Sequence, residues 1–283
     1  MNFFQNLLQY GYLLRAFGAG LAVAAALPLI GMIVSLKRLS MIGDALSHTS
    51  LAGVALGLLL GFNPIVGAVG VCIIAALTIE GVRRKLSRYS EMAIAIIMST
   101  GIGLAAVLMN FLNSPANFNS FLFGSIATIS ALDFWVIAAL CALVIIVFTL
   151  MYTRLFYTAF DEGAARLSGI NVKAVNVIFT VMTAVTVSVA SKIVGALVVS
   201  SLMILPVACA MQFNKGFKAT LFTSCAFALS FMAAGLLISY FADIAPSGAV
   251  VLLAVAVFLI LLAFKALKSK KAKSSAAKEG EKE

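Results

Sequence analysis

Two residues stand out in the sequence for the chemistry that their types and spacing allow. Asp44 and His48 lie four residues apart in the segment GDALSHTS (43–50), and His48 is the only histidine among 283 residues. On an α-helix, residues four apart lie one turn apart on the same face. A carboxylate oxygen and an imidazole nitrogen placed in this way can face one cation or exchange a proton. The chain continues as LAGVALGLLLG, so the pair lies within an apolar run.

Three hypotheses explain this pair. In a structural role, Asp44 caps the start of a helix and His48 donates a hydrogen bond within a helix bundle. In a proton relay, the pair works as intramembrane acids and histidines do in ion-coupled carriers. In a transient metal site, the two side chains bind zinc or manganese, since both ligand types suit these ions. Two ligands are too few for a tight structural site but suffice where the ion must be released. The pair alone does not decide between relay and metal.

The composition indicates whether the chain folds in water or in a membrane. Hydrophobic residues make up 63%, charged residues make up 11%, and the mean hydropathy is +1.13. A soluble domain is about half apolar and about a quarter charged. We therefore expect an all-α polytopic membrane protein with eight or nine transmembrane helices. The apolar runs cover 13–36, 39–61, 64–82, 91–112, 133–153, 172–191, 195–212, 218–241 and 247–265.

The net charge of +10 reflects topology and does not indicate nucleic-acid binding. All lysines and arginines except Arg15 and Lys192 lie in alternate gaps between the apolar runs, at the edges of those gaps, or in the C-terminal tail. Basic residues mark the cytoplasmic side of a membrane protein. The pattern predicts an N-terminus outside the cell and a C-terminus in the cytoplasm.

Other segments add detail to this topology. FLFGSIATIS (121–130) is apolar but too short to cross, which predicts a short re-entrant helix. Pro206 removes a helix hydrogen bond from the seventh run, so we expect a kink there, either static or moving. We divide the chain into a transmembrane permease domain (1–266) and a disordered Lys-rich cytoplasmic tail (267–283).

The depth of the pair depends on where the second helix begins. If it enters the bilayer near Arg38, His48 lies about 15 Å into a core about 30 Å thick, and Asp44 lies about 6 Å nearer the cytoplasm. If it begins at Gly43, Asp44 lies in the interface. Beside the pair, small residues recur every four positions and predict close helix packing. They are Thr49, Gly53, Gly57 and Gly61.

The segment FDEGAARLSGI (160–170) lies on the predicted cytoplasmic side. It has the pattern of a short helix, with acids near its start, a basic residue later and a glycine as a stop signal. Its small side chains could enter a groove on a partner protein, although a polar loop between two spans can also be no more than a loop.

The ordered set of segments resembles the membrane permease of the metal-type ABC importers, which take up zinc and manganese. The likeness rests on LKRLSMIGDALSHTSLAGVALG (36–57), FLFGSIATIS (121–130), FDEGAARLSGI (160–170) and GALVVSSLMILPVACAMQ (195–212). It implies that Asp44 and His48 face the translocation path and are associated with the metal. It also implies that the third segment is the helix that couples the permease to its ATPase. The implied coupling residues are Phe160, Asp161, Glu162, Gly163, Ala164, Ala165, Arg166, Leu167 and Gly169.

By this resemblance, two permease copies work with two cytoplasmic ATPase subunits and an extracellular metal-binding protein in a bacterial cell membrane, surrounded by lipid. The chain is then a transport subunit and not an enzyme, and it carries no cofactor of its own. Its cargo is Zn²⁺ or Mn²⁺, with the histidine favouring zinc. No G-x-x-x-x-G-K-[ST] phosphate loop occurs in the sequence, so ATP must bind to a partner subunit. The alternative is an ion-coupled secondary carrier that uses Asp44 and His48 as a proton relay.

Overall fold

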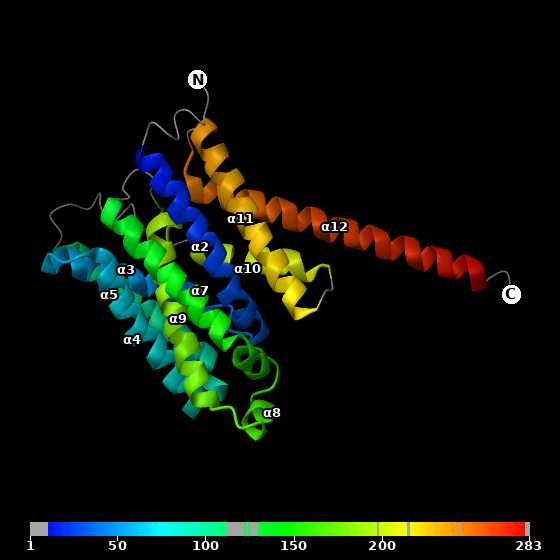
Figure 1. Cartoon of the computed structure of the whole chain (residues 1–283), viewed down its shortest axis with the longest axis horizontal. Helices are drawn as coiled ribbons and strands as arrows, with labels where there is room; N and C mark the ends of the chain where they lie inside the picture. Colours follow the sequence, from blue (N-terminus) through cyan, green and yellow to red (C-terminus); the bar gives the residue numbers. More distant parts are fainter. Residues whose placement is uncertain are drawn as a thin grey trace.

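The computed structural model describes residues 11–111, 122, 124, 130–196, 198–213, 216–242 and 244–280, and their regular structure is helical. Within these ranges there is no strand, and the helices pack as a bundle (Figure 1). In chain order they are α2 (Gly11–Leu36), α3 (Ile42–Leu60), α4 (Pro64–Lys85), the 3₁₀ turn η1 (Ser87–Tyr89), α5 (Ser90–Met109), α7 (Ala131–Phe160), α8 (Glu162–Leu167), α9 (Val172–Val194), α10 (Val199–Met211), α11 (Phe217–Ala242) and α12 (Pro246–Gly280).

Eight of these helices are long and apolar enough to cross a membrane: α2, α3, α4, α5, α7, α9, α11 and α12. The prediction of an all-α polytopic membrane protein with eight or nine spans is confirmed. The ninth apolar run, 195–212, contains only the 13 residues of α10 as helix. At 1.5 Å per residue α10 is about 20 Å long, which is shorter than the membrane core. The re-entrant helix predicted at 121–130 lies largely outside the described residues.

Local sequence signals determine where several helices begin and end. The Asn63 side chain accepts a hydrogen bond from the Ile65 amide, and Pro64 occupies the first turn of α4, where its missing N–H costs nothing. Ser130 and Asp133 form a reciprocal capping box at the start of α7. Gly61 ends α3 in the left-handed conformation, at φ 74°.

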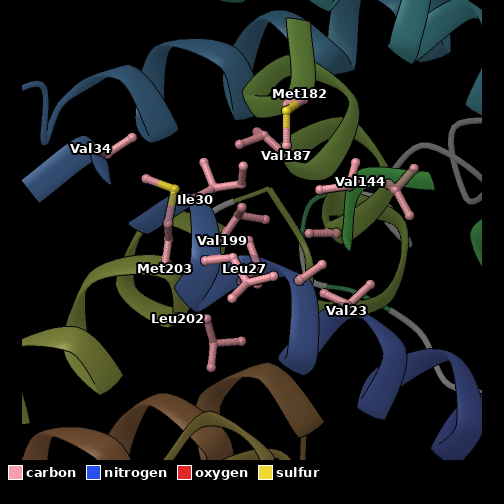
Figure 2. Packing of buried hydrophobic residues seen from close by; sticks show 14 of the residues in the cluster. Val23, Leu27, Ile30, Val34, Val144, Met182, Val187, Val199, Leu202 and Met203 are labelled. Carbon is pink, nitrogen blue, oxygen red and sulfur yellow. The ribbon is translucent and has the colours of Figure 1, made fainter. Parts of the chain in front are cut away.

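Helix α2 lies at the centre of the bundle and packs against α7, α9, α10 and α11. Figure 2 shows Leu27 and Ile30 of α2 among side chains of α10, with Met203 close to both. The two helices approach so closely at Gly31 that a Cβ atom there would collide with the Met203 carbonyl oxygen. Lipid is as apolar as these side chains, so close packing, rather than expulsion of water, holds such helices together.

Helix α3 packs mainly against α4 and α5. A Cβ on Gly53 would collide with the carbonyl oxygen of Gly67 in α4, and a Cβ on Gly101 of α5 would lie 2.7 Å from Thr49. Gly57 similarly faces the backbone of Pro64. Three of the four positions in the predicted small-residue series therefore lie at helix contacts, whereas the fourth, Gly61, ends the helix.

Lys192, one of the two basic residues outside the predicted cytoplasmic side, forms an ion pair. Its Nζ lies 3.6 Å from Oδ2 of Asp133, which belongs to the first turn of α7. Both side chains are nearly buried, with 11% and 12% exposed. The pair joins the end of α9 to the start of α7 and neutralises a cation that the charge pattern does not explain.

Helix α12 leaves the bundle and extends away from it (Figure 1). Its membrane-compatible part ends at Leu267, and the helix continues through the Lys-rich segment to Gly280. The sequence predicts no regular structure for this segment. The division of the chain at residue 266 stays a prediction.

The contact between Gly53 and Gly67 generates a stability prediction. Gly53→Ala should lower the free energy of unfolding by about 1–3 kcal/mol, because the added methyl group meets backbone atoms that cannot move aside. Gly70→Ala, also within a membrane-spanning helix, is the control, since a Cβ there meets nothing within 4 Å. Thermal unfolding of the purified protein in detergent measures both variants. Equal unfolding midpoints would contradict this account of the α3–α4 contact.

Candidate functional site

Asp44 and His48 lie in the first two turns of α3. The helix begins at Ile42, close to the alternative start at Gly43 and not near Arg38. Asp44 is therefore in its first turn, and His48 lies about 9 Å along the axis from the helix start. Both side chains are half-buried, whereas most of their neighbours in the helix are buried. The two residues thus share the partly open face of an otherwise packed helix.

The carboxylate of Asp44 is held by α10. Ser200 Oγ donates a hydrogen bond of 2.5 Å to Asp44 Oδ1. Ser200 is the second residue of α10, so the carboxylate lies in the first turn of α3 and also beside the first turn of α10. The positive ends of two helix dipoles therefore stabilise its negative charge. Gly43 permits this approach, because a Cβ there would lie 3.3 Å from Ser200 Cβ and 2.8 Å from Met203 Cε.

His48 differs from the other polar side chains around it. Ser47, Thr49 and Ser50 each donate a hydrogen bond to a carbonyl oxygen one turn earlier in α3, at 2.9, 2.6 and 2.6 Å. His48 makes no hydrogen bond or ion pair with any residue that the structure describes.

The contacts expected of a purely structural pair are absent from the described residues. The N-cap of α3 is Met41, which makes no side-chain capping bond, and Asp44 bonds to α10 instead. His48 donates no hydrogen bond within this part of the bundle. The structural, proton-relay and metal hypotheses for the pair therefore all stay predictions, and Ser200 is the contact that the structure adds.

One chain does not form a closed metal site within its described part. No group of three or more His, Cys, Asp or Glu residues is close enough there to hold an ion. The four cysteines lie singly, and Cys72 donates to the Leu46 carbonyl oxygen at 3.2 Å. Structural zinc sites use four protein ligands, whereas transport and catalytic sites leave positions open. Asp44 and His48 would give an ion one oxygen and one nitrogen ligand from each chain.

The second predicted feature, the cytoplasmic helix, is α8. The Asp161 side chain caps it by accepting hydrogen bonds from the amides of Gly163 and Ala164, at 2.7 and 3.0 Å. The segment after the helix turns at Gly169, with φ 79°. Phe160 is the last residue of α7. Figure 1 shows α8 at the end of the bundle opposite the start of α2.

The two faces of α8 differ in burial. Ala165 is buried against the bundle. Gly163, Ala164 and Arg166 are exposed, and Leu167 is 92% exposed. A large apolar side chain projecting from a small-residue helix is suited to a groove on a partner protein.

Pro206 lies inside α10, which continues as a helix to Met211. The residue is buried. Its role as a moving hinge stays a prediction.

The sequence analysis did not single out Ser200. The residue lies in a segment quoted for the family resemblance, but serines are common in membrane helices and usually bond to their own backbone. Its contact with Asp44 joins positions 156 residues apart. The only local signal is a pair of serines at the start of a helix in an otherwise apolar run.

Comparison with known proteins places these features in a family. Residues 9–265 match the model of the ABC 3 transport family. The chain is 35% identical over 257 residues to a probable metal transport system membrane protein of Treponema pallidum, covering 91% of this chain and 97% of that one. It is 31% identical to the manganese transport system membrane protein MntC of Listeria innocua, covering 93% and 94%.

A solved structure shares the fold. A chain of PsaBC from Streptococcus pneumoniae, solved in complex with Fab, superposes with a TM-score of 0.83 at 27% identity, covering 92% of this chain and 94% of that one. The fold and the sequence therefore point to the same group of proteins.

The hydrogen bond to Asp44 generates a prediction about stability. Ser200→Ala should lower the free energy of unfolding by about 1.5 kcal/mol, at the lower end for a bond to a charged group, because Asp44 is only half-buried. Ser201→Ala, which removes a hydroxyl that bonds to none of the described residues, is the control. Chemical unfolding in detergent gives both values, and equal losses would contradict the assigned contact.

Proposed function

This chain belongs to the ABC 3 transport family, and we propose that two copies of it form the path of an ATP-driven importer of divalent metal ions. It is a multi-pass cell-membrane protein of the metal-transport permease class, as the family match, its relatives and eight apolar helices show. The proposal extends from this class to the ion, the assembly and the residues on the path.

The single observation that carries the proposal is the arrangement of Asp44 and His48. One carboxylate and one imidazole occupy a half-buried face of a membrane helix, and the imidazole has no partner among the described residues. With α3 beginning at Ile42, Asp44 lies in the interface and His48 lies about one turn deeper, where an ion entering or leaving the membrane core would pass both side chains. A cation that passes the pair offsets the carboxylate charge and takes the imidazole as a second ligand.

A second copy of the chain would complete the coordination. Two ligands from each copy make four, two oxygens and two nitrogens, which is enough to replace much of the hydration shell of a divalent ion. Because each copy holds only half of the set, the ion is released when the copies separate. This requirement for release favours a split site on a transport path over a closed cluster within one chain.

We place manganese first among the cargo ions. The relatives from Listeria innocua and Streptococcus gordonii are named for manganese transport or import. Carboxylate oxygen suits Mn²⁺, and imidazole suits several divalent ions. The preference for zinc drawn from the histidine stays an untested prediction. Since affinity generally favours zinc over manganese, the protein that delivers the ion must supply selectivity.

The sequence and the exposed face of α8 indicate the partner subunits. It has no phosphate-binding loop, so ATP binds to a cytoplasmic partner subunit. The exposed face of α8, with Leu167, is the surface on which that subunit docks. An extracellular metal-binding protein brings the ion to the opposite face, and membrane lipid surrounds the eight apolar helices.

A proton-coupled secondary carrier is the rival function. It would use Asp44 and His48 as a relay and would work without an ATPase. The family match does not favour it. Uptake that needs the ATPase subunit excludes this rival.

Removing either ligand tests the proposal. Asp44→Asn and His48→Gln should each lower the uptake of radiolabelled manganese by at least about tenfold, because even outer-shell partners of metal ligands contribute about 10–100-fold. Uptake is measured in cells that express the permease with its ATPase and binding protein, with zinc assayed in parallel. Glu91→Gln, an exposed acid in the first turn of α5, is the matched control.

Three outcomes are informative. Loss of manganese uptake in both variants, at equal membrane abundance and with the control active, supports the proposal. Loss of zinc uptake alone keeps the site and changes the cargo. Full uptake of both metals in both variants would return Asp44 and His48 to a structural role.

A further inference from the structure

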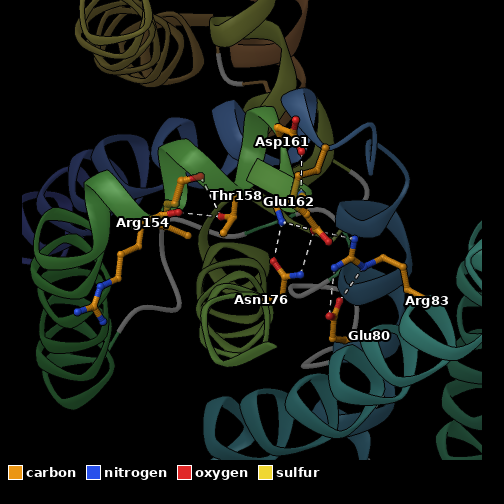
Figure 3. Close-up of polar contacts among 10 residues, drawn as sticks. Glu80, Arg83, Arg154, Thr158, Asp161, Glu162 and Asn176 are labelled. Carbon is orange, nitrogen blue, oxygen red and sulfur yellow. Dashed lines mark hydrogen bonds and ion pairs between the residues drawn. The ribbon is translucent and has the colours of Figure 1, made fainter. Parts of the chain in front are cut away.

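A polar network joins α8 to three other segments near its end of the bundle. Its members are Lys37, which follows α2, Glu80 and Arg83 of α4, Glu162 of α8 and Asn176 of α9. In Figure 3 the side chains of Glu80, Arg83, Glu162 and Asn176 point toward one another. Two cations and two anions balance the charge.

Glu162 is the centre of the network. Its Oε1 accepts hydrogen bonds from Lys37 Nζ at 3.0 Å and Asn176 Nδ2 at 3.0 Å, and it lies 3.5 Å from Arg83 Nη1. Lys37 also donates to Asn176 Oδ1 at 2.6 Å. Glu162 is therefore the one residue of the short α8 helix that contacts three other segments through side-chain bonds within the described residues.

Most side chains of the network are buried, which restricts their movement. The Lys37 side chain is 4% exposed and Glu80 is 4% exposed, whereas Glu162 is 39% exposed. Arg83 donates two hydrogen bonds to Glu80, from Nε to Oε2 at 2.8 Å and from Nη2 to Oε1 at 3.1 Å. A two-bonded arginine–carboxylate pair fixes direction as well as distance. Arg83 thus holds a fixed position in α4 from which it can reach Glu162.

The negative charge of Glu162 persists at neutral pH. Burial alone would raise the pKa of Glu162, but hydrogen bonds from Asn176 and Lys37 and the charges of Lys37 and Arg83 outweigh it and lower the pKa below 4.5. A lowered acid pKa means that the stabilising pairing is present above the ordinary pKa and is lost as the pH falls through the lowered value. The Glu162 carboxylate is therefore charged in the cytoplasmic pH range, whereas burial lowers the pKa of Lys37 from its ordinary value.

Lys37 connects this network to the candidate metal site along a rigid stretch of chain. Three backbone hydrogen bonds fix the stretch: Arg38 N to Ser35 O at 3.2 Å, Leu39 N to Val34 O at 3.0 Å and Ile42 N to Leu39 O at 2.9 Å. Arg38 adopts φ 57°, a left-handed conformation that few non-glycine residues occupy unless their surroundings impose it. Asp44 follows two residues after the start of α3. A displacement of Lys37 is therefore transmitted to the first turn of α3.

A second connection reaches α3 through α4. Arg83 belongs to the helix whose Gly67 is in backbone contact with Gly53 of α3. Both connections end on the helix that carries Asp44 and His48. Contiguous ion pairs and tightly packed backbones are the kind of structure that carries a coupling between distant sites.

We infer that Glu162 is a positioning residue that transmits the motion of the ATPase-docking helix to α3 through Lys37 and Arg83. This inference rests on the proposed function, in which α8 docks on the ATPase. When α8 moves, the shared carboxylate moves Lys37 and the α2–α3 connection with it. Glu162 faces the bundle, whereas docking uses the exposed side of α8, so transmission and docking are separable.

The test compares Glu162 with an acid that lies outside α8 and outside the network. Glu162→Gln removes the charge that Lys37 and Arg83 share. Glu91→Gln, the control, removes the same charge from an exposed position in the first turn of α5, and Glu91 forms no ion pair within the described residues. Both variants are assembled with the ATPase and the binding protein in proteoliposomes. Manganese transport and ATP hydrolysis are then measured in the same vesicles.

Glu162→Gln should lower the number of ions transported per ATP hydrolysed by about tenfold, within the range of ordinary couplings between sites, while ATP hydrolysis continues. Glu91→Gln should leave this ratio unchanged. Lys37→Met should reproduce the defect, and Lys37→Arg, which keeps the cation, should restore most of the ratio.

The contrary results separate two failures. A Glu162→Gln variant with the wild-type ratio would overturn the inference, and so would a parallel loss of hydrolysis and transport, which indicates a defect in docking or folding. If the wild-type assembly hydrolyses ATP but transports no metal ion, the proposed function fails instead.

Discussion

A membrane interior offers no water to polar groups, and the arrangement of this bundle depends on that constraint. Ser47, Thr49 and Ser50 satisfy it within α3 itself, by bonding to carbonyl oxygens of their own helix. Asp44 bonds to another helix, because a charged carboxylate only accepts hydrogen bonds and so needs a donor. It relies on Ser200 at the start of α10. The short α10 therefore supports the site, and glycines at positions 31 and 43 let it come close enough to do so.

The contacts around α3 differ in kind from the contacts around α8. Contacts around α3 in the bundle are backbone against backbone, as at Gly53, and such contacts move as a unit. Near α8 the contacts change to a balanced network of ion pairs around Glu162. Ion pairs can change partners with less disruption than interlocked backbones can. We accordingly propose that α3 holds the ligand pair as a rigid helix. The ion pairs around Glu162 transmit motion to this helix.

Much of this molecule could be predicted from its sequence, and the exceptions have physical causes. Hydropathy identifies the eight spans, because apolar length is a local property. It overestimates α10, because the apolar run 195–212 does not reveal that Gly195 takes φ 88° and delays the helix to Val199. The Asp44–His48 pair is visible because such residues are costly in apolar runs. Ser200, Lys37 and Arg83 were missed because their contacts with Asp44 and Glu162 join segments 79 to 156 residues apart. Only the fold brings these segments together.

The central claim, that the imported ion contacts His48, can be tested by a single spectroscopic measurement, because this chain has one histidine. The permease would be produced without a histidine tag, labelled with ¹⁵N-histidine and assembled with unlabelled partners. Pulsed electron paramagnetic resonance of bound Mn²⁺ would then report any nitrogen ligand. The account predicts a ¹⁵N hyperfine coupling that disappears in His48→Gln. A Mn²⁺ signal from the assembled, transport-competent complex with no ¹⁵N coupling under any nucleotide condition would contradict it.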